Sequence, residues 1–189
     1  DLKPKNILLD DNYYPIITDF GLSKFFDQEQ SAEQTDNIGT YIYMAPEFIE
    51  EPEIFGNTLP IDVFSYGILL YEVWTGLLPF SEAQGSFAKI LNSIVKCKRP
   101  FIPDFLHERW QRLIKSCWSH EPINRPSFNE IISILESDEY LTGIDEAAIK
   151  EYKVFFNDSM KQINDYLLKK SKKQTDDFTK LLIKNDNNS

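Results

Sequence analysis

The sequence predicts a mainly α-helical fold that carries one short β-hairpin near its N-terminus. Two short apolar runs, Ile7–Leu9 and Ile16–Ile17, flank the polar stretch Asp10–Asn12, a pattern typical of a hairpin. The most apolar long segment, Asp62–Gly76, has an acidic residue at its start and a glycine at its end, as helices commonly do. Because 42% of the 189 residues are hydrophobic, the chain can bury a core of ordinary size.

The helix predicted over 62–76 carries apolar residues on nearly all sides, so we expect it to be buried rather than amphipathic. Asp62 at its start suits the positive end of the helix dipole. Helical periodicity recurs over residues 87–95, 108–118 and 128–135, and prolines interrupt it after the first of these segments. The sequence therefore predicts a helical domain built around the segment 62–76.

We expect this domain to cover residues 1–137, followed by a helical and partly disordered tail over 138–189. Apolar residues in the tail recur three or four positions apart, which predicts an amphipathic helix; they are Ile149, Tyr152, Phe156, Met160, Ile163 and Leu167. This helix is expected to pack on the domain, and binding to a partner helix is the alternative. The repeat is too short for a typical coiled coil.

The net charge and the cysteine content indicate which binding partners and which cellular compartment suit this protein. The net charge is −10, which argues against nucleic acid and anionic membrane surfaces as partners, since both attract basic proteins. No run of about 18 apolar residues predicts a membrane span. The two cysteines, Cys97 and Cys117, suit a reducing compartment, so we expect a cytoplasmic location.

A series of short motifs follows in a characteristic order. Each motif by itself also occurs in ordinary surface turns, but their order and spacing resemble the signature set of protein kinases. The motifs are Asp1, Lys3 and Asn6, then Asp19-Phe20-Gly21, Gly39-Thr40 and Ala45-Pro46-Glu47. Further along, Cys117-Trp118 and Arg125-Pro126-Ser127-Phe128 resemble the tyrosine-kinase-like group of serine/threonine kinases. The resemblance implies the large, C-terminal lobe of a kinase, with the hairpin next to the catalytic loop and the small lobe missing.

The resemblance implies a catalytic role for Asp1 and Lys3, with ATP and Mg²⁺ as cofactors. Asp1 would accept the proton of the substrate hydroxyl, and Lys3 would offset charge on the transferred phosphoryl group. Asn6 and Asp19 would bind Mg²⁺ through oxygen atoms, which suit this hard cation. Leu8, together with Leu69 and Val73, would lie under the adenine ring, although burial in a plain core would explain these three residues equally well.

Other positions would support the site. Phe20 would pack below the metal ligand, and Gly21 would let the activation segment rearrange. Thr40 would contact the catalytic Asp and Lys, and the Lys3–Thr40 combination implies a protein substrate phosphorylated on serine or threonine. Ser31 and Thr35 are candidate phosphorylation sites, or simply residues of a solvated loop.

Three further residues are expected to be structural. Glu47 and Arg125 would form an ion pair, and Asp62 would bond to the catalytic loop.

The expected motifs of a kinase small lobe are a glycine-rich loop, a strand Lys and a helix Glu, and residues 1–189 contain none of them. Because positioning accounts for most of this catalysis, we expect little activity from these residues alone. The alternative is a non-catalytic, kinase-like module that serves as an interaction scaffold. The intact set of Asp1, Lys3, Asn6 and Asp19 favours the catalytic interpretation.

Overall fold

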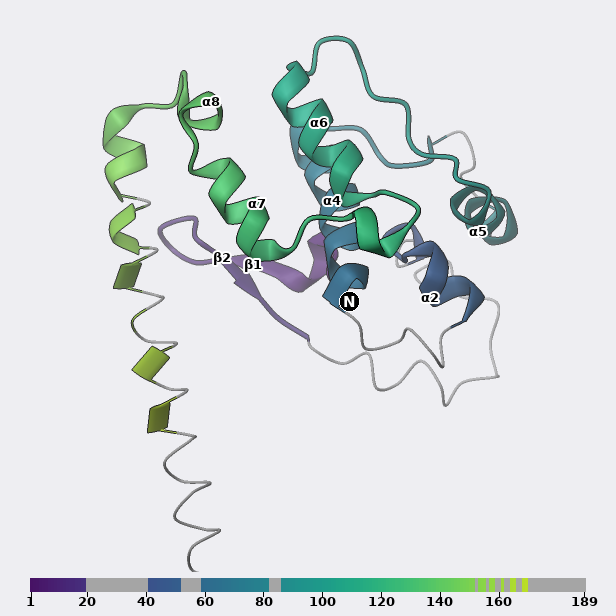
Figure 1. The fold of residues 1–189 in the computed structure, drawn as a ribbon, viewed down its shortest axis with the longest axis horizontal. Coiled ribbons are helices and arrows are strands. Elements are labelled where there is room, and N and C mark those ends of the chain that lie inside the picture. Colours follow the sequence, from purple (N-terminus) through teal and green to yellow (C-terminus); the bar gives the residue numbers. More distant parts are fainter. Residues whose placement is uncertain are drawn as a thin grey trace, which may run out of the picture. The chain divides into compact units, whose positions relative to one another are not determined.

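The computed structural model describes residues 1–19, 41–51, 59–81 and 86–151, and a few positions between 153 and 169. These fall into two compact units, Asp1–Tyr140 and Leu141–Ser189, which are described separately. The first unit contains one hairpin and a set of helices (Figure 1), so the predicted mainly helical fold with a hairpin is confirmed. The elements run in the order η1, β1, β2, α2, α4, α5, α6, η4, α7 and α8.

The hairpin consists of β1 (Ile7–Leu9) and β2 (Pro15–Ile17), which pair antiparallel with Leu8 opposite Ile16. Asp10 organises the turn, because its Oδ1 accepts hydrogen bonds from the backbone N–H groups of Asn12 (2.8 Å) and Tyr14 (2.9 Å). A short acidic side chain that accepts backbone hydrogen bonds in this way stabilises a turn locally. The hairpin predicted from the two apolar runs is therefore confirmed.

Helix α4 (Leu59–Thr75) is the centre of the first unit. It begins earlier than the predicted Asp62, and it ends before Gly76, which adopts the left-handed conformation with φ +66° that favours glycine. Residues from Ile61 to Tyr71 supply much of the core. The prediction of burial all round is wrong for the last turn, where Val73 is 70% exposed, because this end of the helix extends past the elements that cover the rest.

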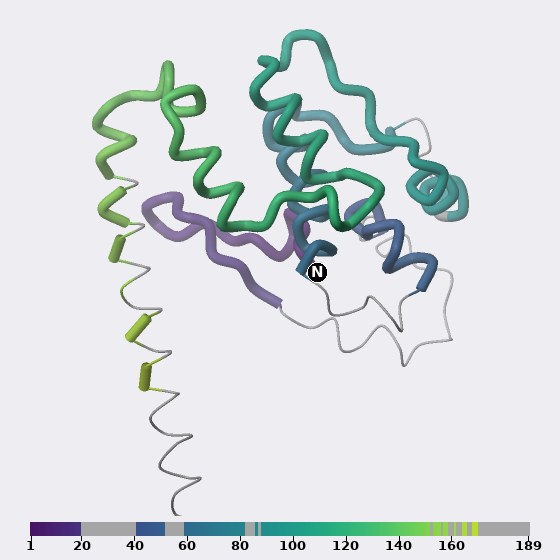
Figure 2. The backbone as a smooth tube through the Cα atoms, viewed as in Figure 1, coloured from purple at the N-terminus to yellow at the C-terminus, as the bar shows by residue number. Residues whose placement is uncertain are grey.

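Helix α6 (Glu108–Cys117) packs directly against α4, and the two helices overlap in the view of Figure 1 and Figure 2. A Cβ atom on Gly67 would lie 2.8 Å from the Cβ of Cys117, so only glycine permits this close approach. Helix α5 (Phe87–Val95) packs instead against the short helix α2 (Pro46–Glu50). Helices α5 and α6 match the segments 87–95 and 108–118 that were predicted to be helical, and α2 begins within the motif Ala45-Pro46-Glu47.

The chain then passes through the 3₁₀ turn η4 (Pro122–Asn124) into α7 (Phe128–Leu135) and the single-turn helix α8 (Asp138–Leu141). Helix α7 starts with a capping box, in which Ser127 and Glu130 satisfy each other's backbone N–H groups. At the end of the unit, Tyr140 meets the ring of Trp110 edge-on at 5.0 Å. The buried hydroxyl of Tyr140 donates to the backbone oxygen of Arg109.

The second unit begins with a turn at Gly143 (φ +83°) and is helical from 146 to 151 and at the later positions that the structure describes. Ile149 of the predicted apolar stripe lies in this helix, and the other five residues of the stripe lie outside the described residues. Among the described residues, no helix has the length and apolar character needed to cross a membrane.

Candidate active site

Two of the predicted site residues, Lys3 and Asn6, donate hydrogen bonds to the carboxylate of a third, Asp1. The ammonium group of Lys3 donates to Oδ2 of Asp1 at 2.6 Å. The amide of Asn6 donates to the same Oδ2 at 3.0 Å and to the backbone oxygen of Asp1 at 2.8 Å. The structure therefore brings Asp1, Lys3 and Asn6 together at Oδ2 of Asp1.

Local chain geometry explains this arrangement. The 3₁₀ turn η1 (Pro4–Asn6) starts at a proline, whose fixed φ suits the first position of a helical turn. The backbone N–H of Asn6 closes the turn on the carbonyl oxygen of Lys3 at 3.0 Å. Asn6 is thereby turned back toward Asp1, where it is buried with only 6% of its surface exposed.

The hairpin returns the chain to Asn6 at Thr18. Both the backbone N–H and the hydroxyl of Thr18 donate to the backbone oxygen of Asn6, at 2.8 and 3.2 Å. Asp19 follows at once, is exposed, and adopts a left-handed conformation with φ +53°. For a residue other than glycine this conformation is uncommon, and it turns the chain sharply just after the hairpin.

Asp1 and Asp19 line the same cleft, which has a volume of about 170 Å³. Asp62 in the first turn of α4 also lines it, and the bond that the resemblance predicts between Asp62 and the catalytic loop stays a prediction. The remaining lining residues are Leu2, Ile17, Thr18 and Phe128. Three separate sequence segments, namely the N-terminal turn, the end of the hairpin and the first turn of α4, therefore supply carboxylates to one cleft.

Lys3 is the cationic residue of this site. Burial lowers the pKa of its ammonium group, and the nearby Asp19 carboxylate partly opposes that shift. Lys3 is therefore influenced by two carboxylates, Asp1 through a direct hydrogen bond and Asp19 through space.

The donor atoms fit a Mg²⁺ ion and the phosphates it accompanies. Because the amide nitrogen of Asn6 donates to Asp1, the orientation of the side chain is set and Oδ1 is its remaining polar atom. Asp19 supplies an exposed carboxylate beside the same cleft. An amide oxygen and a carboxylate, with room for water and phosphate oxygens, are ligands that Mg²⁺ prefers.

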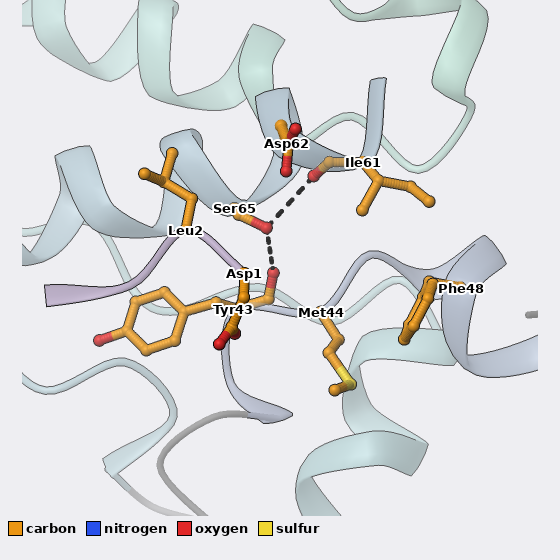
Figure 3. A pocket seen from close by; sticks show the side chains of 8 residues that line it. All are labelled: Asp1, Leu2, Tyr43, Met44, Phe48, Ile61, Asp62 and Ser65. Carbon is orange, nitrogen blue, oxygen red and sulfur yellow. Dashed lines mark hydrogen bonds between the residues drawn. The ribbon is translucent and has the colours of Figure 1, made fainter. Parts of the chain in front are cut away.

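Asp1 and Leu2 also line a second, smaller pocket of about 20 Å³ (Figure 3). The segment before α2 forms one wall with Tyr43 and Met44, and α4 forms another with Ile61, Asp62 and Ser65. The hydroxyl of Ser65 bridges two backbone oxygens, those of Tyr43 (2.7 Å) and Ile61 (3.2 Å), as drawn in Figure 3. The segment 41–44 is thus attached to α4 beside Asp1.

The predicted Glu47–Arg125 pair is present. The guanidinium group donates from Nη1 to Oε1 of Glu47 at 2.5 Å and from Nη2 to Oε2 at 2.8 Å. Both residues are buried, and Arg125 also donates to the backbone oxygens of Pro60, Ser119 and His120. This network joins α2, the start of α4 and the loop after α6.

Two of the residues predicted to lie under the adenine ring are exposed. Leu8 lies on β1 with 55% of its surface exposed, and Val73, expected beneath the same adenine ring, is exposed as well. Five predicted residues lie outside the described part of the chain, namely Phe20, Gly21, Ser31, Thr35 and Thr40.

Sequence reasoning missed Tyr43, Ser65 and Phe128, which line the two pockets, and Glu72, which accepts a hydrogen bond from the Tyr43 hydroxyl. Ser65 and Glu72 are polar residues in a strongly apolar helix, and a buried polar group requires a partner. That rule could have identified both of them. Phe128 carried no such signal, because a phenylalanine at the start of a helix is usually a core residue.

Comparisons with known proteins agree with this geometry. The family model described as "Protein kinase domain" matches residues 1–135. The dual specificity protein kinase shkB of Dictyostelium discoideum is 39% identical over 132 residues, which are 69% of this chain and 20% of that protein. The serine/threonine/tyrosine-protein kinase HT1 of Arabidopsis thaliana is 40% identical over 139 residues, 72% of this chain and 33% of that protein.

A third relative, the serine/threonine-protein kinase STY17 of Arabidopsis thaliana, is 38% identical over 146 residues, 77% of this chain and 25% of that protein. The chain therefore spans between a fifth and a third of the length of these relatives. Their names include both serine/threonine and dual-specificity kinases. The family predicted from the order of the motifs is confirmed, and this chain belongs to the protein kinase domain family.

Proposed function

We propose that the full-length protein carrying these residues transfers the γ-phosphoryl group of ATP to serine and threonine hydroxyls of proteins. The observation that supports this most directly is the Asp1 carboxylate, which holds Lys3 and Asn6 and borders the same cleft as Asp19. A scaffold has no chemical need for this combination of a base, a cation and two oxygen ligands.

In this mechanism the Asp1 carboxylate orients the acceptor hydroxyl and takes its proton. Lys3 keeps the Asp1 side chain in place through its 2.6 Å hydrogen bond and adds positive charge beside the reacting groups. Asn6 and Asp19 would hold Mg²⁺ through their side-chain oxygens. When bound, the ion neutralises charge on the phosphates and orients them.

The specificity for serine and threonine is part of the proposal. It is supported by the presence of Lys3 and Thr40 in the sequence and by the names of several relatives. Because other relatives are named dual-specificity kinases, phosphotyrosine has to be measured as well. A cytoplasmic location completes the proposal, and binding of a partner by the tail helix stays the less favoured alternative.

The direct test is phosphorylation of a generic Ser/Thr protein substrate by the full-length protein with Mg·ATP, followed by phosphoamino-acid analysis. Asp1→Asn removes the base with little change in size, and we expect activity to fall roughly 10²-fold or more. Asp11→Asn makes the same chemical change at an exposed turn position and should leave activity intact. An inactive wild-type protein, or full activity in Asp1→Asn, would contradict the proposal and favour the scaffold alternative.

Residues 1–189 expressed by themselves should show negligible turnover in the same assay, since this segment contains no glycine-rich loop or strand Lys to position ATP. Turnover comparable to that of the full-length protein, and lost in Asp1→Asn, would show that expectation to be wrong.

A further inference from the structure

The connection between α5 and α6 contains a short extended strip, residues 98–104 (Figure 1). Residues 98–103 belong to neither a helix nor a strand, and their burial repeats every third position, with Pro100 and Pro103 buried. The exposed positions of the same repeat are Lys98, Phe101 and Asp104. Proline favours an extended backbone at its own position and at the residue before it, and three residues per turn is the period of the polyproline II helix. The three exposed side chains therefore lie along one edge of the strip.

The strip is attached to the core of the first unit on its inner side. The hydroxyl of Tyr71 on α4 donates to the backbone oxygen of Phe101 at 3.1 Å. The guanidinium group of Arg99 donates to the backbone oxygens of Trp118 at 2.9 Å and Ile94 at 3.2 Å. Because the backbone is held in one position, the outer edge is presented to solvent in one arrangement, which reduces the entropy lost when a partner binds.

The outer edge of the strip is apolar at its centre. Phe101 is 75% exposed, and Phe105, just beyond the strip, is 72% exposed. Single exposed apolar residues are normal on a protein surface, but two phenylalanines four positions apart on a fixed backbone form a patch. Large aromatic side chains of this kind contribute much of the binding energy where a partner buries them.

The two ends of the strip carry opposite charges. Lys98 lies three residues before Phe101, and Asp104 lies three residues after it. Neither side chain forms a hydrogen bond or an ion pair with any residue that the structure describes. Each charge is one turn of polyproline II helix, roughly 9 Å, from the central ring. The edge therefore reads as a cation, an aromatic ring and an anion at equal spacing.

This edge is complementary to itself. If a second copy lies antiparallel across a two-fold axis at Phe101, each Lys98 faces the Asp104 of the other copy and the two Phe101 rings meet at the axis. A purely acidic partner would be repelled by Asp104, and a purely basic one by Lys98. The partner that fits carries both charges in reversed order around an apolar centre, and a second copy of the strip supplies this arrangement.

The charge of the rest of the chain makes this position distinctive. The net charge of the 189 residues is −10, so most surfaces of two copies repel each other. The strip, by contrast, contains two basic residues and one acidic residue. Two copies can therefore approach each other here without the repulsion that acts elsewhere.

We propose that the strip 98–104 is a self-association surface, at which a second copy of this chain binds antiparallel across a two-fold axis at Phe101. So short a strip gives an interface at the small end of the known range, so the dimer is reversible, with a Kd in the micromolar range. Its ion pairs are exposed, so the dimer weakens as the salt concentration rises. The proposal does not depend on catalysis.

The test is charge reversal in the full-length protein, with the dimer measured by sedimentation velocity at low salt. Lys98→Asp places two anions opposite each other at both contacts, and Asp104→Lys places two cations there. We expect Kd to rise at least roughly tenfold in each variant alone. An equimolar mixture of the two variants should dimerise like the wild type. In the mixed dimer the introduced aspartate faces the introduced lysine, and the native pair forms at the other contact.

Lys89→Asp is the matched control, because it makes the same charge reversal at an exposed position of α5 and should leave Kd unchanged. A second measurement locates the two-fold axis. In a Cys97→Ser background, Phe101→Cys brings two thiols together at the axis, so mild oxidation should give a disulfide-linked dimer. Ile123→Cys, at a position that is 90% exposed, should give no such dimer.

A wild-type protein that stays monomeric well above micromolar concentrations would overturn the inference. So would a dimer that neither single reversal weakens, or a mixture of the two variants that stays as monomeric as each variant alone. Circular dichroism checks that the variants fold, and if a reversal variant does not, the cysteine crosslink decides by itself. None of these readouts measures phosphorylation, so failure of this inference and failure of the proposed function are distinguishable.

Discussion

Arg125 holds both carboxylate oxygens of Glu47, although 78 residues separate the two in the sequence. The guanidinium carbon of Arg125 also lies 5.1 Å from the centre of the Phe64 ring, so an aromatic face covers the ion pair from the core side. The pair joins helix α2 to the loop after α6. Its geometry, with two parallel hydrogen bonds, is the strongest that arginine makes with a carboxylate.

Removing Arg125 should destabilise the fold severely. Arg125→Met leaves the buried carboxylate of Glu47 without its partner and three backbone oxygens without a donor, so we expect a loss of about 3–5 kcal/mol in the free energy of unfolding. Urea denaturation followed by circular dichroism measures it. Arg112→Met is the control, because Arg112 is 51% exposed and its ion pairs lie at the surface, where they contribute little to stability. Equal losses in the two variants would contradict this account.

Adding one methyl group between α4 and α6 should also be costly. In Gly67→Ala the new Cβ would lie 2.8 Å from the Cβ of Cys117 and 3.1 Å from the backbone nitrogen of Trp118, so the helices must separate. Overpacking of this kind costs about 1–3 kcal/mol, more than the helix propensity gained from alanine. Gly67→Ala should therefore lower the melting temperature. If the close approach is the cause, the added variant Cys117→Gly should make the Gly67→Ala change less costly than it is in the wild type.

The hairpin should depend on the Asp10 side chain. Asp10→Ala removes the acceptor of two backbone N–H groups in the turn, so the hairpin opens more often and the amides of Ile7–Leu9 exchange faster. We expect a destabilisation of about 1 kcal/mol. Asp11→Ala changes the neighbouring exposed position and should have little effect on exchange. Identical exchange rates in the two variants would mean that the side-chain bonds of Asp10 do not hold the turn.

The two cysteines should react very differently with alkylating reagents. Cys97 is exposed, whereas Cys117 is fully buried, and burial raises the pKa of its thiol to about 12 from an ordinary value of 9.0. At pH 8 we expect rapid labelling of Cys97 and labelling of Cys117 only on unfolding. Mass spectrometry of the labelled peptides measures both rates. Rapid labelling of Cys117 in the folded protein would contradict its burial between α4 and α6.

The Cys117 thiol should make the stability of the fold sensitive to alkaline pH. Below pH 9 the thiol is protonated in both the folded and the unfolded chain. Between pH 9 and about 12 it ionises only in the unfolded chain, so stability falls as the pH rises, by at most about 1.4 kcal/mol per pH unit. Denaturation curves at pH 8, 9, 10 and 11 should show a steeper decline in the wild type than in Cys117→Ala. Parallel declines would mean that other groups account for the alkaline transition.

Much of the local structure could be predicted from the sequence, because it depends on neighbouring residues. The hairpin follows from two apolar runs and an acidic turn, and the helices α5, α6 and α7 follow from periodic apolar positions. The order and spacing of the motifs also identified the family. Three of the motif residues, Asp1, Lys3 and Asn6, are brought together by a single turn of the chain. These are short-range relationships in which spacing alone determines which side chains meet.

What the sequence by itself determined, then, is the family and the local elements. Only the tertiary structure decided which distant groups meet: Tyr43 lies between Ser65 and Glu72, Phe128 borders the cleft of Asp1, and Val73 is left exposed. The physical reason is that burial and long-range hydrogen bonds depend on what packs against a helix, whereas periodicity reports only which faces are apolar.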